Sequence, residues 1–424
     1  MFDPFAWMYR TPRVALISLI VLASIGYFGV YGFGELTERG AQSHNKHFAY
    51  LAQSMLQGRL DVDQELTEQM HEIVLFEGKY YIVYPPMTAI VSLPFVAVFG
   101  PEFRTGLLSI SFAIGAIALM FVWLRRLKCS VEVSWWGAVL FAFGMGFWYS
   151  AIKGSSWQFG HVVGVFFMTW SLVEATGKGR GWLAGLLLGM ALWARLPMVL
   201  ATPFIAYFVW NNLRQSADQD STDDPSQANT RSAWLHAALV FAGVGVFVGL
   251  NALYNFARFG THSNIAYRLI PGVLDEPWYD KGIIHLSYLP RNIHVALFQP
   301  PINIHEFPYF VPAWFGMSML ICTPAYFLIA KVHWARRLPW VLVLATLVCM
   351  GPGLLHGWPG GGQLGYRFSF DAAPMLIALV ALGMSQRFGW RDRGLVILSG
   401  LIGIWGLMYI QQVPVQWLYW PPAP

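Results

Sequence analysis

The feature that most limits what this chain can fold into is its succession of long apolar runs. A helix rises about 1.5 Å per residue, so roughly 20 apolar residues cross a hydrocarbon core about 30 Å thick. Because lipid offers no hydrogen-bond partners, backbone groups must pair within the spanning segment, and this requirement selects helices. Of the 424 residues, 56% are hydrophobic and 12% are charged, which is about half the charged share of an average soluble domain. The sequence therefore predicts an all-α polytopic membrane protein.

Basic residues mark the ends of these runs. The formal net charge of +5 is compatible with binding to nucleic acid or with membrane topology, and its distribution decides between them. Lys and Arg concentrate in short loops: Arg10 and Arg13; Arg125, Arg126 and Lys128; Lys178 and Arg180; Lys331, Arg336 and Arg337; Arg387, Arg391 and Arg393. By the positive-inside rule these loops are cytoplasmic. We therefore expect a multi-pass protein of a lipid bilayer with a cytoplasmic N-terminus, and no nucleic-acid partner.

With those loops inside, the apolar runs predict eleven spanning helices and an outer C-terminus. They are expected at residues 14–34, 105–124, 133–151, 158–175, 182–194, 198–212, 233–256, 313–331, 339–356, 371–386 and 394–411. The first run lacks a small-residue cleavage site and is expected to be a retained helix. Residues 84–100 are also apolar, but they hold three prolines, and a crossing there would conflict with the charge pattern. We expect a juxtamembrane or re-entrant segment on the outer face.

The same topology assigns two long outer loops, at residues 35–104 and 257–312. The first loop contains IVLFEGKYYIVY, in which two apolar runs flank Glu77-Gly78 and predict a small β-hairpin. The segment 213–232 is mostly polar and lacks aromatic residues, which predicts a disordered cytoplasmic loop.

Residues 40–65 predict an amphipathic helix soon after the first span. The apolar residues that define one face, at intervals of three and four, are Phe48, Leu51, Ala52, Met55 and Leu56. We expect this helix to lie on the membrane surface, with Ser43 or Asn45 as its cap. His44, Asn45 and His47 would then stand at the positive end of the helix, where anions are favoured. Each histidine is equally explained as a solvated loop residue.

Polar residues gather at the predicted outer ends of the helices rather than at mid-membrane. They are Lys153, His161, Arg195, Tyr254, Arg258, His356, Tyr366, Arg367 and Asp371. A transporter keeps such residues near the midplane, whereas this arrangement suits a ligand with a lipid tail and a phosphate that arginines bind. Arg195 has an alternative role as a snorkelling helix anchor. Arg367 and Asp371, four residues apart, are alternatively a structural ion pair.

The three cysteines, Cys129, Cys322 and Cys349, are widely spaced and form no metal-ligand pattern. Neither a zinc site nor a disulfide framework is predicted. No cofactor is expected, and a requirement for a divalent metal is left open.

Five stretches resemble, in order, motifs of a known superfamily. They are FAYLAQSMLQG after the first span, the Pro-Pro stretch YPPMTAIVSLPFVAVFG, WLRRLK at a helix end, GWLAGLLLGMALWARLPMVLATPF, and GYRFSFDAAPMLIALVALGM. The chain resembles the GT-C superfamily of polyprenyl-phosphate-dependent membrane glycosyltransferases, specifically its protein mannosyltransferase and aminoarabinose transferase branch. The resemblance implies one GT-C domain over residues 1–424. It also implies inverting transfer of a hexose or pentose from polyprenyl phosphate to an envelope glycan, lipid or protein, at the outer face of a bacterial inner membrane.

The resemblance also implies site residues. In the superfamily an acidic residue at the start of the first-loop helix takes the proton of the acceptor, and the matching position here is His44 or Asn45. Neither is a carboxylate, so the base is left among several candidates. The catalytic candidates are His44, Asn45, His47 and Asp371, with Asp61, Asp63 and Glu65 just beyond the helix. The expected substrate-binding residues are Lys79, Tyr84, Lys153, Arg195, Arg258, Tyr366 and Arg367, with Trp278, Tyr279 and Tyr309 as candidates for stacking on sugar rings.

Two other functions fit the same residues. A non-catalytic binder or flippase of lipid-linked sugars would keep the fold without a base; the missing carboxylate favours it, and the placement of the cations at one face argues against transport. A ligase that uses a lipid-pyrophosphate donor is the second alternative. The identity of the donor separates these functions.

Overall fold

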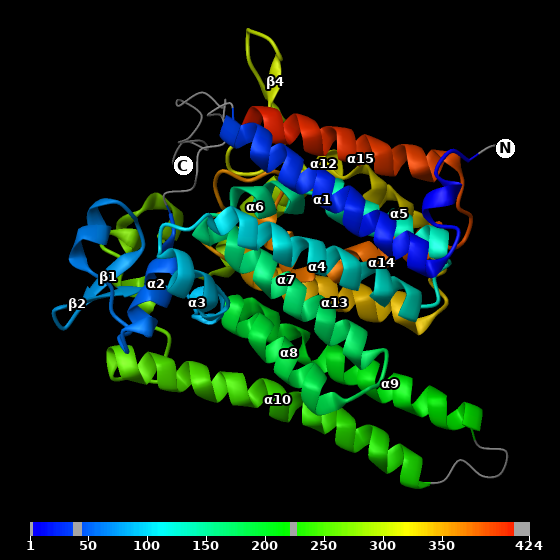
Figure 1. Ribbon diagram of the computed structural model, residues 1–424, viewed down its shortest axis with the longest axis horizontal. Helices are drawn as coiled ribbons and strands as arrows, with labels where there is room; N and C mark the ends of the chain where they lie inside the picture. The colour runs from blue at the N-terminus through cyan, green and yellow to red at the C-terminus, as the bar shows by residue number, and fades with distance from the viewer. Residues whose placement is uncertain (1–2, 37–44, 221–226, 411–424) are drawn as a thin grey trace. The chain divides into compact units, whose positions relative to one another are not determined.

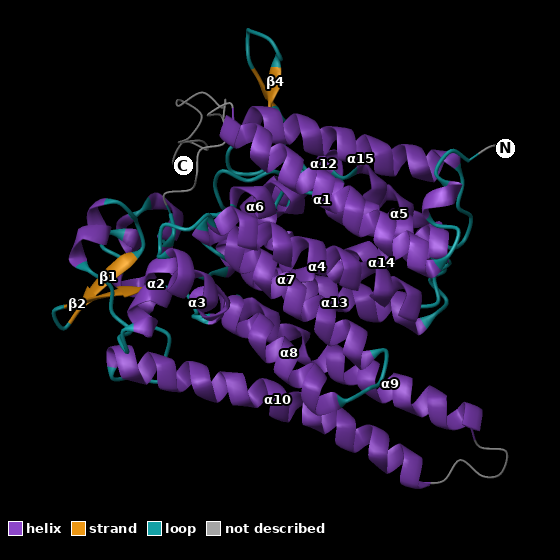
Figure 2. Ribbon diagram, viewed as in Figure 1, coloured by secondary structure: helices purple, strands orange, loops and turns teal. Residues whose placement is uncertain are grey.

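The computed structural model describes residues 3–36, 45–220 and 227–410. Helices dominate these residues, and the strands in them form two short hairpins (Figure 2). The chain forms two compact units, each assembled from separate stretches of sequence. The first unit comprises Met1–Gly40, Lys128–Lys153 and Gly272–Pro424, and the second comprises Ala41–Leu127 and Gly154–Pro271.

The first unit is built around a buried helix, α14 (Ala373–Met384). Its other α-helices are α1 (Pro12–Leu36), α5 (Val131–Phe143), α6 (Phe147–Lys153), α11 (Leu289–Leu297), α12 (Met319–Cys322), α13 (Arg337–Leu354) and α15 (Trp390–Tyr409). Its 3-10 segments are η1 (Ala6–Met8), η5 (Val273–Asp275), η6 (Pro277–Tyr279), η7 (Leu286–Tyr288), η8 (Pro324–Lys331) and η9 (Arg367–Ala372), and its hairpin is β3 (Ile302–Asn303) with β4 (Phe310–Val311). The helices α5 and α13 and the segment η8 pack around α14, whose side chains are apolar on all sides. A helix of that composition belongs inside a bundle.

Ion pairs join helix ends in the first unit. The guanidinium of Arg393, near the start of α15, donates to Asp3 at 2.9 Å and also to Glu132 in the first turn of α5. Lys331, at the end of η8, donates to Asp392 at 2.8 Å. Two of the basic residues that mark loops in the sequence therefore also connect neighbouring helices.

The second unit holds the first-loop elements and a layer of long helices. Its α-helices are α2 (His47–Leu56), α3 (Met87–Phe99), α4 (Thr105–Arg126), α7 (Ser156–Ala175), α8 (Gly181–Ala194), α9 (Thr202–Asp220) and α10 (Gln227–Phe259). Its 3-10 segments are η2 (Gln64–Glu68), η3 (Leu196–Ala201) and η4 (Ala266–Leu269), and its hairpin is β1 (Ile73–Phe76) with β2 (Lys79–Ile82). Helix α4 packs on α7, α7 on α8, and α8 on α10, with α9 beside α10 (Figure 1).

Glycines allow α8 and α10 to approach closely. Gly181, Gly185 and Gly189 recur every four residues along one face of α8. A Cβ atom at Gly185 would lie 2.3 Å from the carbonyl oxygen of Val240, and one at Gly181 would lie 1.7 Å from that of His236. Small residues at a helix contact are a common device in membranes, where packing rather than the hydrophobic effect holds helices together. The glycine-rich motif therefore has a packing role.

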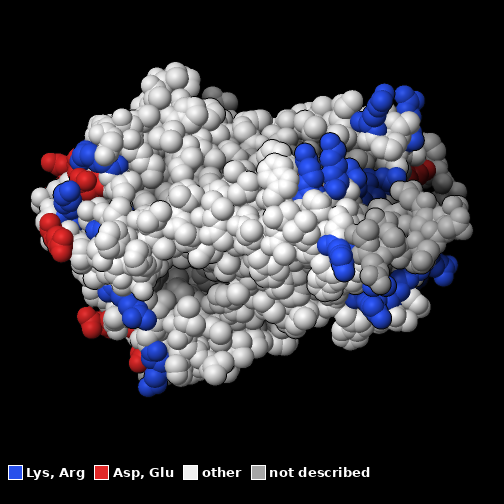
Figure 3. Space-filling view, turned by 90° about the horizontal axis from the view of Figure 1, so that it is seen from below, with Lys and Arg blue, Asp and Glu red and all other residues white. Residues whose placement is uncertain are grey.

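The prediction of a multi-pass helical membrane protein is confirmed, but the count of eleven spans is not. Within the described residues, seven helices are long and apolar enough to cross a membrane, or up to eight if the bent pair α5 and α6 is one span. Helices α3 and α8 are apolar but shorter. On the face shown in Figure 3, Lys and Arg stand in separate groups, and wide areas carry no charged side chain.

Two predicted spans differ from the helices observed. The span 133–151 bends by 51° between α5 and α6, where a Cβ atom at Gly146 would lie 1.9 Å from the carbonyl oxygen of Leu364. The span 313–331 is not a continuous helix, because the four-residue α12 ends before Pro324, whose ring prevents an ordinary helical continuation and opens η8. Hydropathy predicted an apolar segment correctly there, but it did not register these interruptions.

The first-loop hairpin and amphipathic helix are confirmed as secondary structure. Both turn residues, Glu77 and Gly78, have positive φ (49° and 75°), as a two-residue type I′ turn requires. Helix α2 packs on α3, and Phe48, Leu51 and Ala52 of its apolar face are buried, although Leu56 on that face is 51% exposed. The predicted cap is wrong for Asn45, since the N-cap position is Lys46, and the Lys46 side chain makes no capping hydrogen bond. Ser43 lies outside the described residues.

The loop within the polar segment 213–232 is shorter than predicted. Helix α9 continues to Asp220, and α10 begins at Gln227. Arg, Gln and Ala are good helix formers, so a helix leaving the membrane region can continue through them. Residues 221–226 lie outside the described part of the chain. The expected re-entrant segment 84–100 contains α3, which starts directly after Pro86 and includes Pro94; its position in a membrane stays a prediction.

Candidate functional site

In the second unit, the start of α2 is bonded to the start of α7. The backbone N–H of His47 donates to Ser156 Oγ at 3.0 Å, and the backbone N–H of Ser156 donates to the Asn45 carbonyl at 3.1 Å. Ser156 Oγ lies 2.6 Å from the same carbonyl. The first turns of helices have N–H groups without intrahelical acceptors, and here each helix provides one for the other. The segment that holds Asn45 and His47 is therefore held in place by α7.

The imidazole of His47 is engaged at both nitrogens. Its Nε2 lies 2.5 Å from the His71 carbonyl, and its Nδ1 lies 3.0 Å from Ser156 Oγ. The side chain is 0% exposed, and this burial lowers the pKa of His47 to about 4, although the hydrogen bond to the His71 carbonyl acts in the opposite direction. The ring is therefore neutral at pH 7, with Nε2–H as the donor. Protonation of Nδ1 would place a positive charge on a fully buried ring.

A second attachment holds the other side of α2. Lys46 Nζ donates to Glu102 Oε2 at 2.9 Å and to the Glu102 backbone carbonyl at 3.0 Å. The hydroxyl of Tyr50, one turn along α2, donates to the other carboxylate oxygen of Glu102. The positive charge nearest the start of α2 is thus partnered by a carboxylate.

Glu72 is a carboxylate that sequence reasoning missed. Its Oε2 accepts a 2.6 Å hydrogen bond from the indole Nε1–H of Trp157, in the first turn of α7. Glu72 has a φ of 63°, a left-handed backbone conformation that is uncommon for a residue with a Cβ. In the sequence it stands just before the apolar strand β1 in no recognisable motif, so only the fold reveals its position.

Arg195 also contacts helix α7. It follows the last residue of α8, with an extended backbone (φ −148°, ψ 105°), and is half-buried. Its Cγ lies 3.3 Å from the Cβ position of Gly164 on α7. One turn earlier, the Cβ position of Gly160 lies 3.5 Å from the Ala194 carbonyl oxygen and 3.7 Å from the ring of Phe48 on α2.

One face of α7 therefore collects these groups. Trp157, Gly160 and Gly164 are spaced by three and seven residues, which places them on one helix face over about 10 Å. Trp157 contacts Glu72, Gly160 lies beside α2 and the end of α8, and Gly164 lies beside Arg195. A carboxylate and an arginine accordingly stand along the same face of one apolar helix.

Tyr84 also lies near the start of α2. Its ring is edge-on to His47 and tilted against Phe48, with both centroid distances at 5.5 Å. Its hydroxyl is buried and has no hydrogen-bond partner among the described residues. By contrast, Lys79 is exposed at the turn end of β2, where it pairs with Phe76, and the structure does not bring it to Tyr84.

Arg258 makes contacts that hold neighbouring elements of the second unit together. Its guanidinium donates to the Ile82 carbonyl at 2.7 Å and to Asn255 Oδ1 at 2.9 Å. It also lies 3.8 Å from the ring centroid of Tyr254 and 4.6 Å from that of Phe259. These contacts tie the hairpin to the end of α10.

Of the further carboxylates expected near α2, two are partnered locally. Asp61 and Asp63 accept from Arg59 at 3.0 and 3.1 Å, while Glu65 is exposed in η2. His44 lies outside the described residues. Among the residues that are described, no group of three or more His, Cys, Asp or Glu is arranged to hold a metal ion.

Four predicted site residues belong to the first unit: Lys153, Tyr366, Arg367 and Asp371. Tyr366 is buried, and its hydroxyl donates to the Gly353 carbonyl at 2.8 Å. Arg367 donates from its guanidinium to the Gly361 carbonyl at 3.1 Å and from its backbone to Gln363 Oε1 at 3.2 Å. Both Arg367 and Asp371 are buried.

Lys153 is half-buried at the end of α6. Arg367 and Asp371 lie in η9, a 3-10 helix, so residues four apart do not share a face there as they would in an α-helix. Their pairing stays a prediction.

Comparisons with known proteins found similar structures, but the comparisons of sequence found no match. No protein-family model matches the chain, and no curated protein matches it. The chain is similar to the apo crystal structure of the Archaeoglobus fulgidus oligosaccharyltransferase, with a TM-score of 0.48 and 10% identity over 95% of this chain and 56% of that one. The same enzyme tethered to an acceptor peptide gives a TM-score of 0.43 and 11% identity over 96% and 55%.

The Saccharomyces cerevisiae protein O-mannosyltransferase Pmt1-Pmt2 complex, bound to its sugar donor, gives a TM-score of 0.37 and 14% identity over 65% of this chain and 37% of that one. Both enzymes belong to the GT-C superfamily, whose motifs the sequence resembles. This chain spans little more than half the length of the oligosaccharyltransferase, at 56%.

Proposed function

We propose that this protein is a membrane glycosyltransferase that moves a sugar from a polyprenyl-phosphate donor to an envelope acceptor at the outer face of a bacterial inner membrane. The observation that carries the proposal is the face of α7 along which Glu72 and Arg195 stand. The order of the sequence motifs and the multi-pass helical fold support the same proposal. The arrangement gives one apolar helix both an acid–base group and a phosphate ligand.

The proposed reaction is a single displacement at the anomeric carbon. Glu72 takes the proton from the acceptor hydroxyl, whose oxygen forms the new bond to that carbon. The bond from the carbon to the phosphate oxygen breaks, and its electron pair leaves with the polyprenyl phosphate. Arg195 stabilises the charge that develops on the phosphate. A single displacement inverts the configuration of the sugar.

The other expected residues remain candidates for the same roles. In the second unit they are Asn45, His47, Lys79, Tyr84 and Arg258, and in the first they are Lys153, Tyr366, Arg367 and Asp371. Removing a general base costs about 10²- to 10⁴-fold in rate, so the base can be found by substitution. Each carboxylate or histidine in this set is tested in the same assay as Glu72.

The experiment uses the full chain in lipid nanodiscs with two donors, a polyprenyl-phosphate sugar and a polyprenyl-pyrophosphate sugar. The measured product is free polyprenyl phosphate or pyrophosphate. We expect release from the monophosphate donor, and a loss of at least about 100-fold in Glu72→Gln. Glu68→Gln and Arg268→Gln, at exposed positions of the same unit, are the matched controls for Glu72→Gln and Arg195→Gln. If neither donor releases its lipid phosphate, the proposal that the protein is an enzyme is refuted. If only the pyrophosphate donor releases it, the protein is instead a ligase that uses a lipid-pyrophosphate donor.

A specific observation favours a second candidate, a non-catalytic binder of lipid-linked sugars. Asn45 stands where the resemblance calls for a carboxylate, and His47 has both ring nitrogens engaged. Donor binding that is retained while no lipid phosphate is released would support this candidate.

A further inference from the structure

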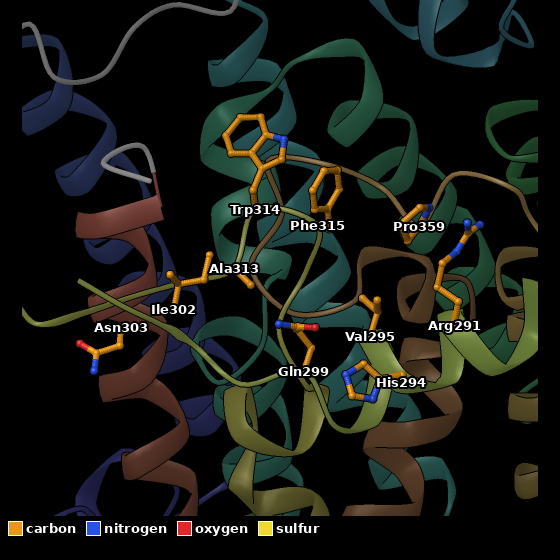
Figure 4. A pocket seen from close by; sticks show the side chains of 10 residues that line it. All are labelled: Arg291, His294, Val295, Gln299, Ile302, Asn303, Ala313, Trp314, Phe315 and Pro359. Carbon is orange, nitrogen blue, oxygen red and sulfur yellow. The ribbon is translucent and has the colours of Figure 1, made fainter. Parts of the chain in front are cut away.

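The first unit contains a cavity of about 500 Å³, lined by residues between 291 and 303, by residues 313–315 and by Pro359 (Figure 4). This volume is within the range of small-molecule sites, roughly 300–1,000 Å³. Residues of α11, the β3 strand and the segments around residues 299, 314 and 359 line it. None of the proposed catalytic residues of the second unit is among the lining residues.

Trp314 and Phe315 form an aromatic wall of the cavity, and neighbouring residues hold both side chains in place. The Phe315 ring packs against Trp278 at 5.4 Å and Trp358 at 5.3 Å, and those two indoles are in edge contact at 4.8 Å. Trp314 lies against Gly361, whose Cβ position is 3.0 Å from the indole nitrogen. Interlocked aromatic side chains lose little freedom when a ligand packs on them, so the wall is suited to the apolar C–H face of a ring.

A buried amide faces the cavity beside that wall. Gln299 is 8% exposed and lines the cavity (Figure 4), and its Oε1 has no hydrogen-bond partner among the described residues. A buried polar atom without a partner is costly and usually indicates a missing ligand or water. Asn303, which is exposed on the same lining, adds a second amide. Two amides offer both donors and acceptors, as hydroxyl groups require.

The charge on the lining is positive. Among the described residues that line the cavity, Arg291 and His294 carry or can acquire a charge, and none is Asp or Glu. The Arg291 guanidinium donates to the Gly357 carbonyl and lies over the rings of Trp278 and Tyr288 at 5.4 and 5.1 Å. Its Nε has no partner among the described residues. A fixed guanidinium with a remaining donor is suited to binding an anion.

We propose that this cavity binds a saccharide that carries a phosphate or carboxylate group. The ring packs on Trp314 and Phe315, the hydroxyls bond to Gln299 and Asn303, and Arg291 binds the anionic group. The role of this saccharide as part of the acceptor rests on the function proposed above, whereas the binding itself does not.

The test measures binding by saturation-transfer NMR and calorimetry with the full chain in nanodiscs. The probes are hexose and pentose 1-phosphates, glucuronate, glucose and inorganic phosphate. We expect the charged sugars to bind about tenfold more tightly than glucose, because only they engage the guanidinium. Inorganic phosphate should bind more weakly than the sugar phosphates, because it lacks the ring.

Three variants separate the contributions. Trp314→Leu should weaken the binding of every sugar about tenfold. Trp7→Leu, at an exposed tryptophan of the same unit, should leave the affinities unchanged. Arg291→Lys should weaken the binding of the charged sugars about tenfold and leave the affinity for glucose unchanged. Asn303→Ala, at an exposed position, should weaken the binding of the sugars several-fold.

The proposal is overturned if no sugar binds saturably, or if binding is the same in Trp314→Leu, Arg291→Lys and Asn303→Ala as in the wild type. A chain that binds charged sugars through these residues but releases no lipid phosphate would refute the proposed transferase and leave this site standing. A chain that transfers sugar without binding these probes would overturn the site alone.

Discussion

Protonation of His47 should release the start of α2. The ring is fully buried, its pKa is about 4, and an unfolded histidine titrates near 6.5. Between these values the opened state binds more protons than the closed one, so the stability of the closed state falls as pH drops below about 6.5 and levels off below about 4. The full difference is about 3 kcal/mol, and roughly 2 kcal/mol of it is lost by pH 5.

The assay is hydrogen–deuterium exchange of peptides from α2, with rates corrected for the chemical effect of pH. Between pH 7.5 and 5 the protection of α2 should fall by roughly 30-fold, the equivalent of about 2 kcal/mol. Staying at or above pH 5 keeps most carboxylates ionised, so the change reports on histidine. In His47→Gln, which cannot titrate, protection should be nearly independent of pH over this range.

His71→Gln is the matched control. His71 is exposed and contributes its backbone carbonyl to His47, so this variant keeps the hydrogen bond and should keep the pH dependence. The reasoning is refuted if α2 protection is constant from pH 7.5 to 5 in the wild type. It is equally refuted if His47→Gln shows the same fall as the wild type.

Three further changes probe the packing. Gly185→Ala should destabilise the protein by roughly 1–3 kcal/mol, because its Cβ would meet a backbone carbonyl of α10, whereas Gly249→Ala, which faces open space, should be neutral in thermal unfolding. Arg258→Met removes two hydrogen bonds of a buried guanidinium and should increase exchange of the hairpin by an amount that corresponds to roughly 2–4 kcal/mol. Glu102→Gln removes the ion pair with Lys46 and should cost about 1–3 kcal/mol in unfolding measurements, because the ammonium of Lys46 is only 7% exposed and loses its charged partner.

Local patterns predicted local structure well. Glu77 and Gly78 carry their own turn preference, and the spacing of Phe48, Leu51 and Ala52 depends only on helix geometry. The predicted cap was wrong, because the N-cap is Lys46 and the backbone N–H of His47 donates to Ser156, more than 100 residues away. A capping rule evaluates nearby residues and has no means of including such a partner.

Glu72 shows the same limit at the candidate site. Its neighbours in the sequence give no sign of a role, and its hydrogen-bond partner, Trp157, is 85 residues away. Gln299 and Trp314 likewise stand in unremarkable stretches and acquire a common role by lining one cavity. Chemistry that depends on side chains from distant segments is visible only after the chain has folded.

The sequence by itself determined that this chain crosses a membrane as helices, because hydrophobic length and the need to pair backbone groups in lipid are properties of continuous segments. It also determined the hairpin and the amphipathic helix of the first loop, for the same local reason. Only the tertiary structure decided where α7 places Glu72 and Arg195, how closely α8 approaches α10, and which residues enclose the cavity. Those features are contacts between segments far apart in the chain, and their energies depend on packing that no local pattern encodes.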